Sequence, residues 1–396
     1  MVDNLTLPAP GSQRRALHVL TLTPFYPTPG DDAQGCFVAE PLPLLARLGI
    51  INTVIAVQPF YRPHVIGASQ AFSARSVRFF SLPGGVGLPV AGAFLFARLL
   101  NIARTLHQSH PIDVIHAHAA LPCGHAAALI SDELKIPFVV TVHGLDAYST
   151  KQVKGPPGKW CAHVSKFVYR KAASVICISE KVRARVLEVS KQNVKTGVVY
   201  NGVDSEMFYP AANEPIGQSI LCVGNLIPTK GHELLLRAFA AMHTAFPAVV
   251  CQFIGEGPER ARLGRTAAKL GINHKVQFLG RRSRMEVANA MRRSLLFALP
   301  SSYEGLGCVY LEAMASAKTA IACRGQGIDE IIEHGINGWL ITPGSQDEMT
   351  EALIRLLSNP QRRIELGQEA RQTILQDFTL AHQAERLAGI YKERVG

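Results

Sequence analysis

Short apolar runs alternate with longer amphipathic segments along almost the whole chain. Runs of this length, bounded by Pro, Gly or polar residues, are typical of parallel strands that are buried on both faces of a sheet. In the first half the strand candidates lie at 17–22, 53–57, 113–116, 138–142, 174–178 and 197–199. Helix-compatible segments such as 38–48 and 124–134 separate them. The alternation predicts an α/β fold built on a doubly wound parallel sheet.

The same pattern starts again near Ser219. The second set of apolar runs lies at 220–223, 249–254, 276–279, 295–299 and 319–322. Between the two sets, residues 201–210 are rich in turn formers and suit a linker. We therefore expect a first domain at 1–205, a second at 206–378 and a last helix within 379–396. Two Rossmann-like halves in tandem place a cleft at the carboxyl ends of their strands.

Composition excludes several other classes of protein. A hydrophobic content of 47% and a charged content of 18% describe a globular chain. The 8 cysteines are scattered and form no C-x-x-C pair, which favours small buried side chains in a reducing compartment over zinc sites or disulfides. The apolar run at 16–23 has only the length of a strand and ends at Pro24, so we expect no secretion signal.

One uncharged stretch, residues 79–97, needs comparison with a membrane span. Proline and glycine interrupt it, and its continuous helical part, about 90–106, contains Arg98 and Arg104. A span needs about 20 mostly apolar residues. The stretch therefore predicts either an ordinary core helix or an amphipathic helix that lies at a membrane surface.

The most informative stretch follows the apolar run 295–299. Gly305 and Gly307 lie where the next helix should begin, and such an end favours an anion. Glu304 precedes this end and Glu312 follows after seven residues; on one helix they would be about 80° apart around the axis and roughly 12 Å along it. An ionised carboxylate only accepts hydrogen bonds, so Glu312 suits a vicinal diol such as ribose. The alternative is a loop glutamate and a solvated helix glutamate.

Glu304-Gly-Leu-Gly followed by Glu312-Ala-Met-Ala resembles the Glu-x7-Glu signature of retaining, nucleotide-sugar-dependent glycosyltransferases of the GT4 family. The resemblance implies a GT-B fold, in which two Rossmann-like domains face a central cleft and the last helix crosses back to the first domain. It places the acceptor in the first domain and the nucleotide sugar in the second. It also implies that Glu304 holds sugar hydroxyls and Glu312 the ribose, with the donor diphosphate at the backbone of Gly305, Leu306 and Gly307.

Two further motifs of the second half resemble the same family. The family pattern is Gly-Arg-Leu, a short gap and Lys-Gly, with both cations gripping the leaving diphosphate. Lys230 matches, whereas Asn225 stands where the arginine usually is; it removes one charge but can still donate hydrogen bonds. Gly255 belongs to a loop that resembles the family loop near the nucleotide base.

In the first half, polar residues follow the strands that point into the cleft. His143 resembles the family histidine that positions the donor sugar and supports transfer, and Asp146 lies in the same loop. His118 ends the preceding strand, where it can line the same cleft. The His-x-His pair resembles metal ligands, but no companion ligands accompany it, so no metal is expected. Gly35 either lets backbone approach a diphosphate or acceptor, or only makes a turn.

The implied reaction moves a sugar from a nucleoside diphosphate to a hydroxyl with the anomeric configuration retained. Lys230, with the N–H groups near Gly305, can stabilise the departing diphosphate, so neither a metal nor another cofactor is expected beside the nucleotide-sugar donor. His143, Glu304 and Lys230 are the candidate catalytic residues. Two alternatives remain: a sugar-nucleotide epimerase of related fold, and a non-catalytic sugar-nucleotide-binding protein, which Asn225 keeps open.

The net charge of +11 is unevenly distributed, with +9 in residues 1–205 and +2 in residues 206–396. This excess either attracts an anionic membrane surface or a polyprenyl-diphosphate carrier, or is a solvated basic face. No nucleic-acid-binding motif accompanies it. We therefore expect a cytoplasmic enzyme at the inner face of the membrane, acting on a lipid-linked saccharide or another polysaccharide or glycolipid precursor. A basic cluster in the first half comprises Lys151, Lys154, Lys159, Lys166, Arg170 and Lys171.

Overall fold

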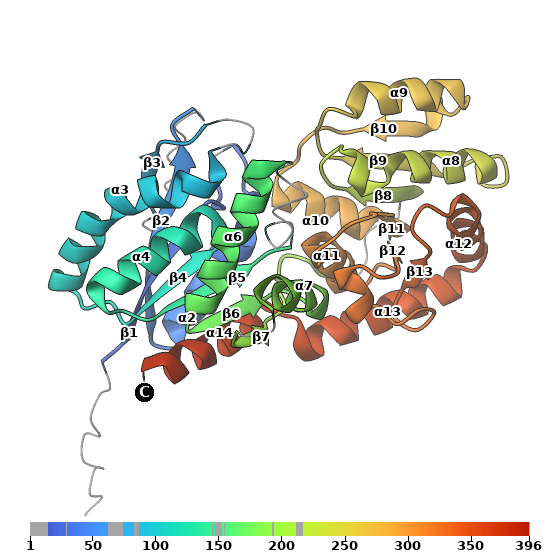
Figure 1. The fold of residues 1–396 in the computed structure, drawn as a ribbon. Helices are drawn as coiled ribbons and strands as arrows, with labels where there is room; N and C mark the ends of the chain where they lie inside the picture. Colours follow the sequence, from blue (N-terminus) through green and yellow to red (C-terminus); the bar gives the residue numbers. More distant parts are fainter. Residues whose placement is uncertain are drawn as a thin grey trace, which may run out of the picture.

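The chain folds into two lobes, each built on its own parallel sheet (Figure 1). The computed structural model describes residues 15–28, 30–61, 74–82, 85, 87–144, 146, 153, 155–191, 194–210 and 217–395. Within these ranges the first sheet has the strand order β3-β2-β1-β4-β5-β6-β7 and the second has the order β10-β9-β8-β11-β12-β13. All the pairings between strands are parallel, which confirms the predicted fold class.

The strands of the first sheet are β1 (Leu17–Thr23), β2 (Ile50–Pro59), β3 (Ala74–Phe79), β4 (Val114–His118), β5 (Phe138–Val142), β6 (Ser174–Cys177) and β7 (Thr196–Val198). Those of the second are β8 (Ser219–Val223), β9 (Val250–Ile254), β10 (Val276–Phe278), β11 (Leu296–Ala298), β12 (Ala320–Cys323) and β13 (Trp339–Ile341). The central strands β4, β5 and β6 are buried along their whole length. The predicted runs therefore became strands because both of their faces are covered.

Helices surround both sheets. In the first lobe they are α1 (Cys36–Ala39), α2 (Leu42–Arg47), α3 (Leu88–Ser109), η2 (Ala120–Gly124), α4 (His125–Leu134), α6 (Pro156–Lys171) and α7 (Glu180–Ser190). The helix-compatible segment at 38–48 is helical over most of its length, but it is divided between two short helices, α1 and α2. Pro41 is the N-cap of α2 and Pro43 lies in its first turn, and proline cannot donate the backbone hydrogen bond that would continue one helix into the other.

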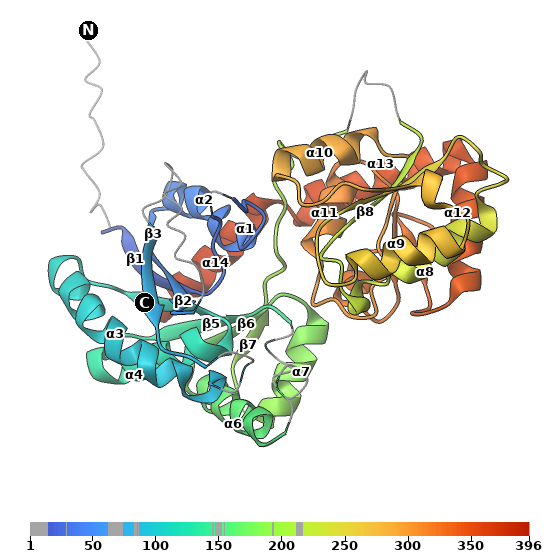
Figure 2. The same cartoon turned by 90° about the horizontal axis from the view of Figure 1, so that it is seen from above.

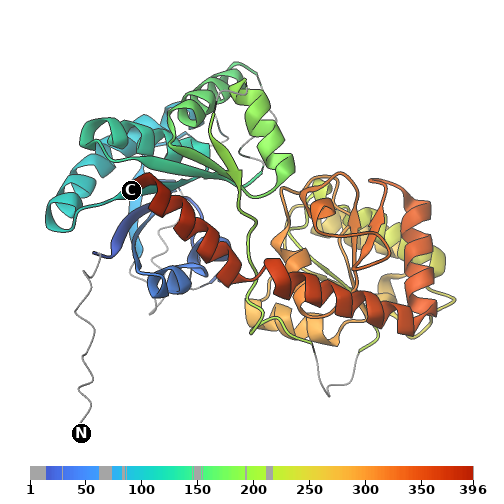
Figure 3. The ribbon, with the colours of Figure 1, turned by 90° about the horizontal axis from the view of Figure 1, so that it is seen from below.

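In the second lobe the helices are η4 (Pro228–Lys230), α8 (His232–Met242), α9 (Arg260–Lys269), η5 (Asn273–Lys275), α10 (Arg284–Arg293), α11 (Cys308–Ala315), η6 (Gly327–Glu330), α12 (Gln346–Ser358) and α13 (Pro360–Asp377). The last helix, α14 (Leu380–Val395), leaves this lobe and packs against α2 and β4 of the first (Figure 3). The hydroxyl of Tyr391 lies 2.7 Å from Nδ1 of His116 on β4. The chain thus passes between the lobes twice.

The apolar helix expected near 90–106 is α3. Leu95, Leu99 and Ala103 are fully buried on its inner face, whereas Phe94 is 46% exposed. In the parts of the chain that the structure describes, no helix is both long and apolar enough to cross a bilayer.

Candidate active site

A pocket of about 540 Å³ lies between the lobes, at the carboxyl ends of the strands. Figure 2 shows α1 of the first lobe on the side that faces α10 and α11 of the second. The second lobe contributes six residues that the sequence analysis singled out: Asn225, Lys230, Gly255, Glu304, Gly307 and Glu312. The first lobe closes the pocket with residues from the β1–α1 loop and α1: Asp31, Ala33, Gln34, Cys36 and Phe37.

Lys230 and Glu304 form a partly buried ion pair in this pocket. Lys230 ends η4, the short turn after β8, and its Nζ lies 2.5 Å from Oε1 of Glu304. The hydroxyl of Ser301 donates to the same carboxylate oxygen over 3.0 Å, and the backbone N–H of Glu304 donates to the side chain of Gln326. Two neighbours therefore hold Oε1 of the Glu304 carboxylate and a third holds its backbone, which leaves Oε2 to accept from a ligand.

The expected helical relation between the two glutamates is wrong. Helix α11 begins only at Cys308, after Gly307, so Glu304 belongs to the preceding loop. Gly307 has φ 88°, a left-handed conformation that glycine adopts easily and that other residues rarely do. The chain turns at this residue. Glu304 and Glu312 consequently reach one pocket from a loop and a helix, and the separation calculated along a helix axis does not apply.

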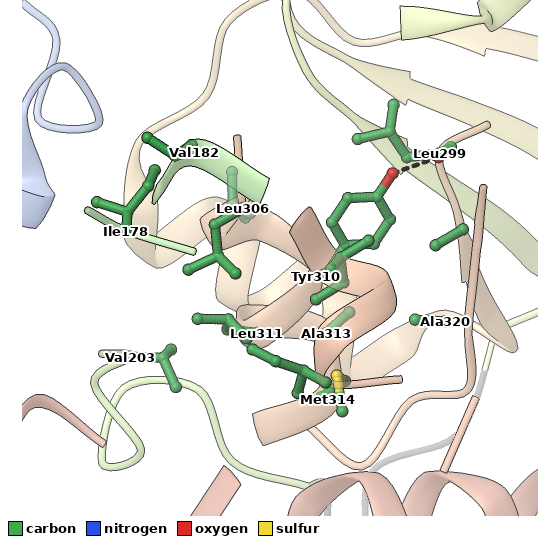
Figure 4. Packing of buried hydrophobic residues seen from close by; sticks show 14 of the residues in the cluster. Ile178, Val182, Val203, Leu299, Leu306, Tyr310, Leu311, Ala313, Met314 and Ala320 are labelled. Atoms are coloured by element: carbon green, nitrogen blue, oxygen red, sulfur yellow. Dashed lines mark hydrogen bonds between the residues drawn. The ribbon is translucent and has the colours of Figure 1, made fainter. Parts of the chain in front are cut away.

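Gly305 and Leu306 have structural roles beside the pocket. A Cβ at Gly305 would lie 2.7 Å from the carbonyl oxygen of His143 in the other lobe, so a glycine is needed for this close contact. The Leu306 side chain is fully buried and packs with Ile178 and Val182 of the first lobe (Figure 4). Only the backbone of this segment remains for the anion contact that the sequence predicted.

Glu312 is held by a residue that the sequence analysis missed, Arg284, at the start of α10. Nη1 of Arg284 donates to Oε1 of Glu312 over 2.6 Å, and Nε lies 2.7 Å from Oε1 of Glu40, just after α1. The backbone N–H of Arg284 donates to the carboxylate of Asp32. Arg284 is only 7% exposed. Burial raises the pKa of Glu40 to about 7, an effect that Arg284 partly opposes.

The predicted histidines line a smaller cavity next to this pocket, and Phe37 borders both spaces. Nδ1 of His118 lies 2.9 Å from Nε2 of His143. Burial lowers the pKa of His143 to about 3 and that of His118 well below its ordinary value, so both rings are neutral at pH 7. The other ring nitrogen of His143, Nδ1, is buried and makes no hydrogen bond to any described residue.

The structure also shows the surroundings of Asp146 and Gly35, the two loop residues of the first lobe that the sequence indicated. Asp146 accepts a hydrogen bond from the backbone N–H of His143 over 2.9 Å, which holds the His143 loop at the end of β5. Gly35 has φ 72°, and a Cβ there would lie 2.4 Å from the backbone of Phe25. Turn geometry and this close approach therefore account for Gly35. Among the described residues, no group of three or more His, Cys, Asp or Glu side chains could hold a metal ion.

Comparison with known proteins agrees with this arrangement of two lobes. Residues 42–207 match the family described as Glycosyltransferase Family 4, and residues 212–373 match Glycosyl transferases group 1. An uncharacterized glycosyltransferase of Methanocaldococcus jannaschii is 32% identical over 273 residues, 69% of this chain and 73% of that protein. The α-D-kanosaminyltransferase of Streptomyces kanamyceticus is 27% identical over 379 residues, 88% of this chain and 96% of that protein.

A solved structure shares the whole fold. Anabaena HepE, crystallised in complex with UDP, superposes with a TM-score of 0.75 over 95% of this chain and 100% of that chain, at 21% identity. The chain therefore belongs to glycosyltransferase family 4 and is a glycosyltransferase with the GT-B fold.

Proposed function

We propose that this glycosyltransferase takes a sugar from a nucleoside diphosphate sugar and transfers it, with retention of configuration, to a hydroxyl of a lipid-linked saccharide or related glycolipid or polysaccharide precursor. The proposal rests mainly on the ion pair of Lys230 and Glu304 at the wall of the pocket between the lobes. This pair places a cation that can bind phosphate beside a carboxylate that can accept hydrogen bonds from sugar hydroxyls. The structures of HepE with UDP and with UDP-glucose support a nucleotide-sugar donor.

Lys230 and the start of α11 would act on the leaving diphosphate. Negative charge grows there as the glycosidic bond breaks, so a fixed ammonium group stabilises the transition state more than the ground state. The first N–H groups of α11 have no acceptor within the helix, and this end of the helix lines the pocket. The positive end of the helix dipole therefore faces the pocket and favours an anion there. Asn225, which also lines the pocket, would add hydrogen bonds in place of the usual arginine.

Glu304 would accept hydrogen bonds from the donor sugar, and His143 would support its position from the first lobe. The His143 ring is neutral, and its buried Nδ1 makes no hydrogen bond to a described residue. A sugar hydroxyl could satisfy that nitrogen when the donor is bound. Asp146 and His118 would keep the ring in place through the loop backbone and Nε2, respectively.

The surface of the first lobe, which is the lobe proposed to bind the acceptor, has features that support contact with an anionic membrane. Phe60, Phe80 and Phe94 form an exposed aromatic cluster, with Phe60 and Phe80 stacked at 5.4 Å between ring centroids. Arg78 and Arg98 border this cluster and supply the cations that an anionic lipid surface attracts. Of the predicted basic cluster, Lys151 and Lys154 lie outside the described residues, whereas Lys159, Arg170 and Lys171 are exposed on α6.

A binding panel followed by product analysis tests this function. UDP-, ADP- and GDP-glucose should be compared by thermal shift, because binding to the folded state raises the apparent stability. The donor that binds is then incubated with candidate lipid-linked acceptors, and the anomeric configuration of the product is read by NMR. Retained configuration supports the proposal. An epimer formed without acceptor, or binding with no turnover for any acceptor, would favour the two alternatives instead.

A further inference from the structure

Arg284 lies where three parts of the molecule meet. Its guanidinium contacts Glu312 of the second lobe and Glu40 of the first, at 2.6 Å and 2.7 Å. It also lies over the ring of Phe208 in the segment between the lobes, 5.1 Å from the ring centroid. Both carboxylates have little exposed surface, with side-chain exposures of 8% for Glu312 and 20% for Glu40. One buried cation thus joins a donor-pocket glutamate to the opposite lobe.

We propose that Arg284 is a positioning residue that orients Glu312 for the nucleotide, and that Glu40 sets the orientation of Arg284, so that donor affinity depends on a contact made by the first lobe. The inference rests on the proposed contact of Glu312 with the donor ribose. Glu312 and Arg284 border the pocket, whereas Glu40 is absent from its lining. Glu40 therefore influences the donor from outside the pocket, and its ion pair with Arg284 is the contact that carries this influence.

The physical reason is the limited set of partners for a buried guanidinium. Removing one partner of a buried ion pair leaves charge without compensation, and the remaining groups move to recover it. Without a negative charge at residue 40, the Nε side of Arg284 loses its anion and the side chain is free to turn about Glu312. Outer partners of this kind keep a ligand-binding group in its productive orientation. Because coupling is reciprocal, donor binding would in turn strengthen the contact between the lobes.

A second contact between the lobes offers a matched control. Glu330 of η6 accepts hydrogen bonds from the backbone N–H groups of Glu180 and Lys181 at the start of α7, over 2.7 and 2.8 Å. Glu330 does not line the donor pocket. A Glu330→Gln change weakens attraction between the lobes without touching Arg284. It therefore separates a general effect of lobe contact from a specific effect through Arg284.

The experiment is a double-mutant cycle on the full chain, with affinity for UDP-glucose measured by calorimetry, or for ADP- or GDP-glucose if the wild type prefers it. We expect Glu40→Gln to weaken binding at least about fivefold, Glu312→Gln to weaken it more, and the double variant to bind no worse than Glu312→Gln alone. Arg284→Lys keeps the charge but loses the planar guanidinium, which can donate to two carboxylates at once. Its donor affinity should therefore resemble that of Glu40→Gln. Melting temperatures confirm that each variant is folded.

Other results would overturn the inference in distinguishable ways. If Glu312→Gln weakens binding but Glu40→Gln does not, or does so only as much as Glu330→Gln, Arg284 is structural and the proposed function stands. If the effects of Glu40→Gln and Glu312→Gln simply add, Glu40 does not act through Glu312. If Glu312→Gln leaves affinity unchanged, the proposed ribose contact is wrong and the inference is overturned with it.

Discussion

Nζ of Lys230 lies 2.5 Å from Oε1 of Glu304, so the proposed phosphate cation and the proposed sugar acceptor hold each other in place before any donor enters. The two side chains come from turns that follow different strands of the second sheet, β8 and β11. Each charge lowers the cost of burying the other. An arriving diphosphate would share Lys230, while the carboxylate keeps a further oxygen for sugar hydroxyls. The pair is therefore preorganised for a donor that carries both groups.

Glu304→Gln should lower kcat by about a hundredfold while the fold is kept, because the neutral amide cannot pair with Lys230 or supply the same acceptor. The measurement is release of UDP from UDP-glucose, or of the corresponding nucleotide from the selected donor, at saturating donor concentration. Glu365→Gln, a change at a half-exposed position on α13 of the second lobe, is the control. A rate near that of the wild type would remove Glu304 from the catalytic residues.

Lys230→Ala should also reduce kcat strongly, by about a hundredfold or more, since charge develops on the diphosphate only as the bond breaks. Lys230→Arg, which keeps the charge, should retain part of the rate. Steady-state kinetics with varied donor distinguish the two possible roles. A raised KM with unchanged kcat would mean that Lys230 binds the ground state and the transition state equally.

Most strands and the position of the pocket could be predicted from the sequence, because buried parallel strands are apolar runs and their carboxyl ends meet at one edge. Strand β3 was missed because Arg75 and Arg78 interrupt its apolar pattern at the edge of the sheet. The division of the segment at 38–48 into two helices was missed because proline positions override helical periodicity. Local sequence patterns therefore predict elements correctly where the element is fully buried, and they fail at the edge of a sheet and where proline divides a helix.

The site was only partly predictable. Glu304 and Lys230 lie in turns that follow strands, so strand ends locate them, and the spacing from Glu304 locates Glu312 on the next helix. Arg284 was missed because its partners, Glu40 and Glu312, lie in other elements, and no local pattern signals a contact between lobes. The only local signal is the capping box of Ser283 and Glu286, which fixes where α10 begins but says nothing about what Arg284 faces. The glycine at 305 likewise matched a phosphate loop, while its tight contact is with His143.

Asn225→Arg should leave turnover unchanged or raise it a few-fold. Asn225 lines the pocket that also contains Lys230, and a second cation near the leaving diphosphate would add to the charge stabilisation. The assay is the same nucleotide release, with donor affinity measured in parallel. Asn225→Asp, which brings a negative charge to the same place, should lower both values. A large loss for Asn225→Arg would indicate a specific partner of the amide instead.

Donor affinity should fall as the pH is lowered from about 8 to about 6. The pKa of Glu40 is about 7, raised by burial and by the charges of Glu312 and Asp204 and lowered by Arg284. Protonation below that pKa removes the negative charge that holds Arg284, and so has the same effect as Glu40→Gln. The thiols of Cys36 and Cys308 also face this group, but burial raises the pKa of both and keeps them neutral.

The test of this pH dependence uses UDP-glucose, whose diphosphate lacks the monoester group that titrates near pH 6. Wild type should lose about fivefold in affinity across the range, whereas Glu40→Gln should show a flat profile at the weaker level. Equal slopes in the two proteins would assign the pH dependence to another group.

The exposed aromatic cluster predicts reversible binding to anionic membranes. Phe80 is 50% exposed and Phe94 46% exposed, and Arg78 and Arg98 lie beside them. Aromatic rings suit the membrane interface, and each basic residue near an anionic leaflet contributes about 1 kcal/mol. The wild type should therefore co-sediment with vesicles that contain anionic lipid at low salt. Salt should weaken this binding, because charges are screened beyond a Debye length of about 8 Å at physiological ionic strength.

Paired substitutions locate the contact. Phe80→Ser with Phe94→Ser should abolish most sedimentation, and charge reversal at Lys159 and Arg170 on α6 should weaken it, while both spare affinity for UDP-glucose. Ile354→Ser, an exposed apolar change on α12 of the second lobe, should bind vesicles like the wild type. Equal sedimentation with neutral and anionic vesicles, or none with either, would remove the membrane contact and favour an acceptor free in solution. Loss of UDP-glucose binding together with sedimentation would instead assign the altered residues to the active site between the lobes.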